Sequence, residues 1–348
     1  MSRIFVAGLG AVSPAGWTVA AMREAVDRGE PLPSQPLEQR HDKSLLARLV
    51  PNPATRPDFL SHPRLRRASA ITHYTASAAL EASAVYRKAC PQGRLGVIVC
   101  MQSGCVQYSC RFYDETLKNP STASPLLFPE TVYAAPSSHT AALLENVALV
   151  NSLVGDPSVF LQGVSLAVQW LMEERVDACL VIGAEETNWI TADALWHLDR
   201  SSSLAAGAGA LCLCRELQWS LGVELKAITD PIPYSAKISR ARAARRMREQ
   251  LLNGSTCHNG ELLCDGLGNS LRTNAPEISA WRDWTGPRLS PKRILGEGLM
   301  AAAAWQCVAA CDAVASGRVT TANVSLVGFH QQAIGAKFGS ISPANNLK

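Results

Sequence analysis

Apolar and polar positions follow two different periods along this chain, and the segments with each period alternate. Short continuous apolar runs predict buried strands at 4–7, 95–101, 179–182, 208–214, 223–228, 261–265 and 324–327. A helical period predicts helices at 18–28, 70–87, 158–174, 239–252 and 298–315. Strands that are apolar on both faces and alternate with helices are typical of sheets covered on both sides. The pattern therefore predicts a layered α/β protein.

The second part of the chain repeats the strand and helix pattern of the first. We therefore expect two α/β halves, at 1–217 and 218–348. Residues 30–63 are rich in proline and predict irregular surface structure. Gly8 and Gly10 predict that the first strand ends in a glycine turn. A dinucleotide-binding loop is disfavoured, because a third glycine at the required spacing is absent.

Composition fits a large folded core. Hydrophobic residues make up 47% of the 348 residues and charged residues only 18%, which excludes a disordered chain. The net charge of +4 is too small to imply a nucleic-acid partner. No uncharged apolar run is long enough for a transmembrane helix, and the first apolar run is too short for a signal peptide. We expect a cytoplasmic protein without a membrane partner.

The eleven cysteines form no CxxC pair and no cluster with zinc spacing. They lie in apolar stretches, where free thiols behave as small hydrophobic residues. This usage fits a reducing compartment, and we expect no metal site.

Several short segments occur in a defined order along nearly the whole chain. They are 6–16, 66–69 followed by Tyr74, 94–97, 128–131 followed by His139, 176–185, 290–298 and 327–329. In this order and spacing they resemble the β-ketoacyl-ACP synthase family of the thiolase superfamily. The resemblance implies a thiolase-like five-layered αβαβα fold of two duplicated halves and a dimer. It implies acyl-phosphopantetheine on a carrier protein as substrate, and no further cofactor.

The chemistry that this resemblance implies is decarboxylative carbon–carbon bond formation. The family uses a cysteine at a helix N-terminus, where the helix dipole favours the thiolate. Two histidines then stabilise the enolate that decarboxylation leaves.

All three of these groups are replaced in this chain. The cysteine position falls on Pro157, whether it is counted forward from His139 or back from Asp177. The two histidine positions fall on Leu267 and Glu297. Proline suits the first turn of a helix but has no nucleophilic side chain. The standard reaction is therefore not expected, and the chain is similar to chain-length factors, which lack the nucleophile.

Part of the family's pocket is nevertheless retained. Lys292 and Phe329 match family positions, and His330 follows Phe329 on a loop that lines the family's acyl site; a surface role for His330 stays open. Chain-length factors typically carry glutamine at the cysteine position, but the nearest one here, Gln162, is five residues further on. We expect Glu297 to pair with Lys292 in the vacated histidine site.

Two further residues are candidates for a chemical role. His139 is expected to be a buried structural histidine. Cys105 is the best substitute nucleophile in the N-terminal half, but an ordinary buried thiol is the simpler interpretation.

Partner contacts are predicted in two regions. We expect a dimer through the N-terminal half, with segment 158–174 or the residues before it near the interface. Aromatic residues are candidates for the end of an acyl tunnel at that interface, with core packing as the alternative: Tyr108, Phe112, Tyr113, Phe128 and Tyr133. Arg242, Arg245 and Arg246 share one helix face, which predicts either a solvated surface or a docking site for an acidic carrier protein.

Three functions fit these observations. The first is a non-catalytic subunit that forms a heterodimer with an active ketosynthase in polyketide or fatty-acid-like chain elongation, and is a transferase only as part of that complex. The second is a ketosynthase-like acyltransferase or decarboxylase that uses atypical residues. The third is an acyl-binding scaffold that acts alone.

Overall fold

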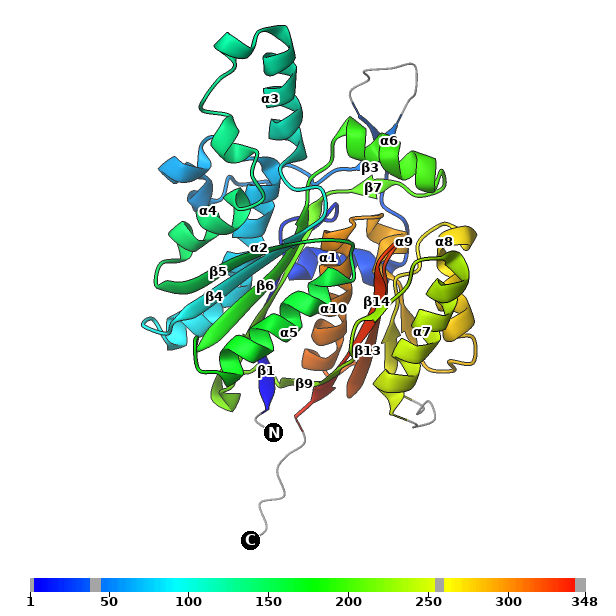
Figure 1. Ribbon diagram of the computed structural model, residues 1–348. Coiled ribbons are helices and arrows are strands. Elements are labelled where there is room, and N and C mark those ends of the chain that lie inside the picture. The colour runs from blue at the N-terminus through cyan, green and yellow to red at the C-terminus, as the bar shows by residue number, and fades with distance from the viewer. Residues whose placement is uncertain (1–2, 38–44, 254–259, 342–348) are drawn as a thin grey trace.

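The computed structural model describes residues 3–37, 45–253 and 260–341 (Figure 1). The strands are β1 (Ile4–Val12), β2 (Gln35–Pro36), β3 (Leu46–Arg48), β4 (Leu95–Met101), β5 (Val147–Val154), β6 (Ala178–Glu185), β7 (Leu204–Ala205), β8 (Gly207–Cys214), β9 (Val223–Ile228), β10 (Ile232–Pro233), β11 (Leu262–Cys264), β12 (Arg288–Leu289), β13 (Thr321–Val327) and β14 (Gln332–Ser340). The α-helices are α1 (Val19–Arg28), α2 (Ala70–Ala89), α3 (Val106–Lys118), α4 (Ala135–Leu144), α5 (Val159–Met172), α6 (Trp189–Leu198), α7 (Lys237–Leu252), α8 (Leu271–Ala280), α9 (Pro291–Leu295) and α10 (Met300–Ala315). Short 3₁₀ helices include η4 (Phe128–Glu130).

Two sets of strands have the same pairing pattern, which confirms the predicted duplication. The first runs β1-β8-β6-β4-β5 and the second β9-β14-β13-β11-β12. In each set the first two pairings are antiparallel and the last two are parallel. A short antiparallel pairing of β1 with β9 joins the two sets. The division at residues 217 and 218 stays a prediction.

The layers follow from which helix covers which face. In Figure 1, α5 and α10 lie between the strands of the first set and β13 and β14 of the second. Helices α2 and α4 cover the outer face of the first set, and α7 and α8 lie on the outer side of the second. This is the predicted five-layered arrangement. Helix α10 is buried on all sides from Met300 to Val314, and its alanines let both sheets approach closely.

The central strands are buried on both faces, which explains their continuous apolar runs. In β6, Cys179 and Val181 contact the middle layer, whereas Leu180 and Ile182 contact the core beneath α2. Alternate side chains of a strand point to opposite faces, so each face supplies a different core.

The prediction that β1 ends at Gly8 is wrong, because the strand continues to Val12. Both glycines face α2. A Cβ at Gly8 would lie 1.9 Å from the carbonyl oxygen of Ala82, and one at Gly10 would lie 2.0 Å from that of Ala78. These glycines therefore permit close helix packing rather than a turn.

The described residues contain no helix that is long and apolar enough to cross a membrane. They also contain no group of three or more histidine, cysteine or acidic side chains placed to hold a metal. All described cysteines are free thiols, and Cys257 lies outside the described residues.

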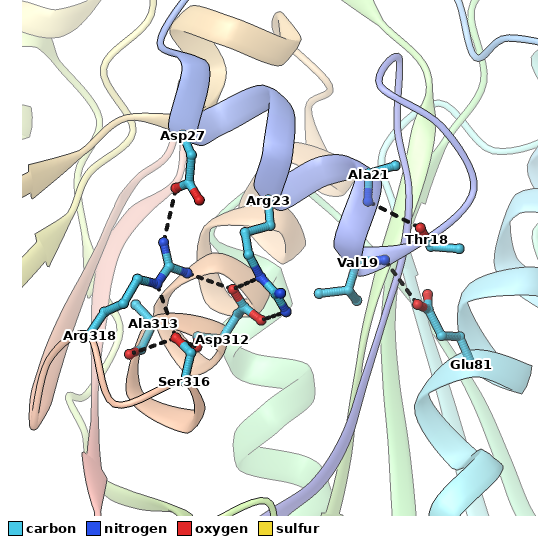
Figure 2. Close-up of polar contacts among 10 residues, drawn as sticks. All are labelled: Thr18, Val19, Ala21, Arg23, Asp27, Glu81, Asp312, Ala313, Ser316 and Arg318. Carbon is cyan, nitrogen blue, oxygen red and sulfur yellow. Dashed lines mark hydrogen bonds and ion pairs between the residues drawn. The ribbon is translucent and has the colours of Figure 1, made fainter.

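Figure 2 shows how the end of α10 is fixed. The Asp312 carboxylate is buried in the last turn, where the helix dipole disfavours a negative charge. Arg23 of α1 donates to it from Nε at 2.8 Å, and Arg318 donates from Nη2 at 2.6 Å. Arg318 also contacts the exposed Asp27 at 2.9 Å. Two guanidinium groups therefore satisfy this carboxylate and tie α1 to the middle layer.

Helix α1 is also anchored at its start (Figure 2). Glu81 of α2 accepts hydrogen bonds from the backbone N–H groups of Val19 and Ala11, each at 2.9 Å. The Thr18 side chain caps the helix by accepting from Ala21 N. Helix α1 is thereby tied to α2 at its start and, through Arg23, to the end of α10.

We predict that Asp312→Ala lowers the free energy of unfolding by about 2 kcal/mol, because charge-assisted hydrogen bonds to a buried group are lost. Asp27→Ala is the matched control, since its pair with Arg318 is exposed and contributes less than about 1 kcal/mol. Urea unfolding monitored by circular dichroism measures both. Equal losses for the two variants would contradict a special role for the buried carboxylate.

Candidate functional site

The turn between β5 and α5 holds the position that the family resemblance assigns to the nucleophile. Pro157 is buried in this turn, directly before the helix begins. Its neighbour Asp156 accepts a hydrogen bond from Ser158 N at 3.2 Å and another from the Ser158 hydroxyl. The helix start is thus intact, but its polar contacts are internal and it presents no nucleophilic side chain at residue 157.

Asp156 also reaches the loop between β13 and β14. Its carboxylate accepts from His330 N at 3.3 Å and from Gln331 N at 3.0 Å. In return, Asp156 N donates to the Gln331 side-chain oxygen at 3.3 Å. The start of α5 and the 328–331 loop, which come from different halves, are therefore joined at this point.

The predicted pair of Lys292 and Glu297 is confirmed. Lys292 Nζ donates to Glu297 Oε2 at 2.9 Å, and both side chains are buried. The other carboxylate oxygen accepts from Leu299 N at 2.9 Å, just before α10. A buried charge thus has a partner at the second histidine position, and no imidazole is present there.

Leu267, at the first histidine position, is also buried, after β11. Two acidic side chains lie close by: Asp265 accepts from Leu267 N at 3.3 Å, and Glu277 of α8 accepts from Gly266 N at 3.2 Å. Burial raises the pKa of both carboxyl groups above their usual values. This position therefore combines the alkyl side chain of Leu267 with two buried carboxyl groups, and it carries no imidazole.

A pocket of about 580 Å³ opens beside these positions. Its walls come from the end of α6, the starts of α7 and α8, and the 328–330 loop, and they include Phe329 and His330. Lys292 and Gln162 are not among its lining residues. Lys292 points to Glu297, with Nζ 5.5 Å from the centre of the Phe329 ring, and Gln162 donates to the Gln332 side chain at 3.1 Å.

Sequence reasoning did not identify the other walls of this pocket. The residues that line it include Leu198, Tyr234, Arg240 and Arg272. The Tyr234 hydroxyl donates to the carbonyl of Gly328 and so supports the loop. These residues carry no motif, and the fold brings them together from α6, from the region of α7 and from α8.

The candidate tunnel aromatics lie on and beside α3, which projects from the fold (Figure 1). Helix α3 has no buried residue. The rings of Phe112 and Phe128 are 5.7 Å apart, and Tyr108 and Phe112 are half-buried. We call the exposed apolar residues here the α3 surface: Tyr113, Leu117, Leu126, Phe128, Val132 and Tyr133. The alternative that these aromatics fill the core is therefore not what the structure shows.

The β5 strand forms an edge on the same half. Among the described residues it pairs only with β4, and Val150 and Val154 on it are exposed. Exposed apolar edge strands are unusual unless a partner covers them.

Two buried acids anchor the base of α3. Glu186 accepts from Gln107 N at 2.7 Å and from Ile71 N at 3.0 Å, so it satisfies the starts of both α3 and α2. Glu185 accepts from Gln102 N and Ser103 N in the preceding turn. Burial raises the pKa of Glu186 to about 7 and that of Glu185 to about 8. These hydrogen bonds therefore anchor the start of the helix that carries the α3 surface.

Cys105 has no properties of a substitute nucleophile. It is buried, and burial raises the pKa of its thiol to about 12, so the thiolate is not formed near neutral pH. His139 has a structural contact, since its Nε2 lies 3.0 Å from Glu130 Oε1, but it is half-buried and not buried as expected.

The three arginines predicted to share a face, Arg242, Arg245 and Arg246, are all exposed on α7. Arg248, further along the helix, instead bonds to Asp283. The structure therefore leaves a positively charged outer surface next to the pocket.

Comparison with known proteins bears on the fold. No protein-family model matches the sequence, and no curated protein matches it. A β-ketoacyl synthase from Burkholderia phymatum superposes with a TM-score of 0.83 at 15% identity, over 98% of this chain and all of the other. The ishigamide ketosynthase/chain length factor gives 0.80 at 16% identity, with 98% and 100% covered.

A third solved structure, a type II polyketide acyl-carrier protein in complex with its ketosynthase, gives a TM-score of 0.78 at 16% identity, with 98% of this chain and 99% of the other covered. At such low sequence identity, the structural similarity establishes the fold but not the activity. The chain therefore has the thiolase-like fold of ketosynthases, as its motifs predicted.

We predict that Lys292→Met alone lowers the free energy of unfolding by about 3–5 kcal/mol, because Glu297 is left buried without its partner. The double variant Lys292→Met/Glu297→Leu removes both charges and recovers most of that loss. Denaturant unfolding of both variants measures the difference. If the double variant is as unstable as the single one, the ion pair is not what holds this site.

Proposed function

We propose that this chain is a non-catalytic, chain-length-factor-like subunit that pairs with an active ketosynthase and acts on chains bound to an acyl carrier protein. The observation that carries the proposal is the start of α5, where Pro157 lies at the position that the family resemblance assigns to the nucleophile. Leu267 and Glu297 stand at the two histidine positions, and the polar groups around them are satisfied internally. A ketosynthase fold is retained without the groups of the standard reaction.

The apolar surface of the N-terminal half supports the pairing. The α3 surface exposes six large apolar side chains, and the β5 edge exposes two more. Contiguous exposed apolar residues and uncovered strand edges are typical of protein interfaces. The solved ketosynthase/chain length factor structures provide a precedent for a partner of this kind.

The outer face of the C-terminal half supports contact with a carrier protein. Arg242, Arg245 and Arg246 are exposed beside the pocket, whose lining is mainly apolar. Exposed arginines steer an acidic partner mainly through the rate of encounter. The pocket also favours a second candidate, an acyl-binding protein that acts alone, which would bind acyl ligand without any partner.

The first prediction is that the isolated chain forms no acyl-enzyme, because Pro157 carries no nucleophilic side chain at the position assigned to the cysteine. Intact-mass spectrometry after incubation with acyl-carrier substrate measures this. A cysteine-bearing ketosynthase treated in parallel serves as the positive control. A stable acyl adduct on any residue of this chain would sink the proposal.

The second prediction concerns pairing through the α3 surface. Tyr113→Glu and Phe128→Glu, which are 63% and 56% exposed, should each weaken binding to the partner ketosynthase at least tenfold, because a charge is buried on association. Leu271→Glu is the matched control, since Leu271 is 82% exposed but lies on α8. Analytical ultracentrifugation of the mixed subunits decides the question. Unchanged affinity in both α3 variants would place the interface elsewhere.

The third prediction is that the aromatic residues close the end of the partner's acyl tunnel. Phe112→Ala and Tyr113→Ala should lengthen the product while turnover is retained, because truncation opens space without removing chemistry. Mass spectrometry of products from the reconstituted pair gives their length. Unchanged length in folded variants of Tyr108, Phe112, Tyr113, Phe128 and Tyr133 would rule out this tunnel end.

A further inference from the structure

The Asp156 side chain is a buried carboxylate held by neutral donors. It is 5% exposed, and it accepts from three backbone N–H groups and one hydroxyl. The donors are Ser158, His330 and Gln331. No cation stands among the partners that the structure gives it. Converging backbone amides form anion-binding sites in proteins, so this arrangement has the features of such a site.

The site is shaped closely around the carboxylate. A Cβ at Gly328 would lie 2.0 Å from Asp156 Oδ2, so a side chain there would displace it. Gln331 both donates from its backbone to Asp156 and accepts from Asp156 N. The hydroxyl of Tyr234 holds Gly328 from the other side. Glycine at residue 328 therefore allows the carboxylate to approach the loop closely.

The same loop forms a wall of the large pocket. Phe329 and His330 line the pocket, and the amide of His330 is one of the donors to Asp156. If the carboxylate were absent, two adjacent loop amides would lose their acceptor. An unsatisfied buried N–H group is costly, so the loop would shift or take up another anion.

We propose that Asp156 is the chain's own ligand for an anion site formed by the start of α5 and the 328–331 loop. Its carboxylate fills the site, keeps external carboxylates out of the space in front of residue 157, and fixes the pocket wall. Asp156 acts here as a positioning residue. The inference does not depend on pairing with a ketosynthase, and it applies to the isolated chain.

The test removes the Asp156 carboxylate by mutation and supplies a small carboxylate from solution in its place. Asp156→Ala leaves a space of the size of formate, and Asp156→Gly leaves a space of the size of acetate. Each variant should lose several degrees of Tm and regain roughly half of that loss in about 0.1 M of its matched anion. Each should respond less to the other anion and to sodium chloride at the same ionic strength.

Hydrogen exchange of the peptide spanning residues 328–332 gives a readout that stability alone does not. Exchange should be at least tenfold faster in Asp156→Ala and slow again when formate is added. Wild type and Asp283→Ala, which removes an exposed carboxylate paired with Arg248, should show no response to formate.

Asp156→Asn keeps the size and loses the charge, so its loop should exchange faster and formate should not slow it. This variant also covers the case in which the smaller side chains prevent folding. Normal exchange in Asp156→Asn, or equal effects of formate, acetate and chloride on folded Asp156→Ala, would overturn the proposal.

Discussion

The structure depends on the burial of two helices, α5 and α10, between two sets of strands. Each helix packs against strands of both halves, and α10 has no exposed residue between Met300 and Val314. Such close burial requires short side chains on the helix, and the alanines of α10 meet that need. The starts of α5 and α10 lie close together at the boundary between the halves. The packing of this middle layer therefore positions the residues of the site.

The same burial determines how the polar groups of the site must be satisfied. A buried position that loses a functional group still needs its polar neighbours satisfied. Glu297 forms an ion pair with Lys292, and Asp156 accepts hydrogen bonds from backbone N–H groups of the 328–331 loop. Both contacts close the site with groups of the chain itself. These contacts agree with the proposed role, in which the chain contributes shape and surfaces rather than a nucleophile.

Much of the fold was predictable because the central strands are buried on both faces, and β4 lies at the predicted residues 95–101. Strand β5 was not predicted, because Asn151 and Ser152 interrupt its apolar residues and one edge is uncovered. Helix α3 was not predicted, because it buries no face in this chain. The position of Pro157 followed from spacing, but the contact of Asp156 with residues 174 and 175 positions away required the fold.

The central claim is that this chain contributes shape and surface to chain elongation but not the nucleophile. The most direct measurement is product formation on the carrier protein by this chain alone, by an active ketosynthase that bears the catalytic cysteine, and by the two together. The account predicts elongated product from the mixture, with every acyl group traced by mass spectrometry to the cysteine of the ketosynthase. Elongated product from the isolated chain, or no effect of this chain on the ketosynthase, would contradict it.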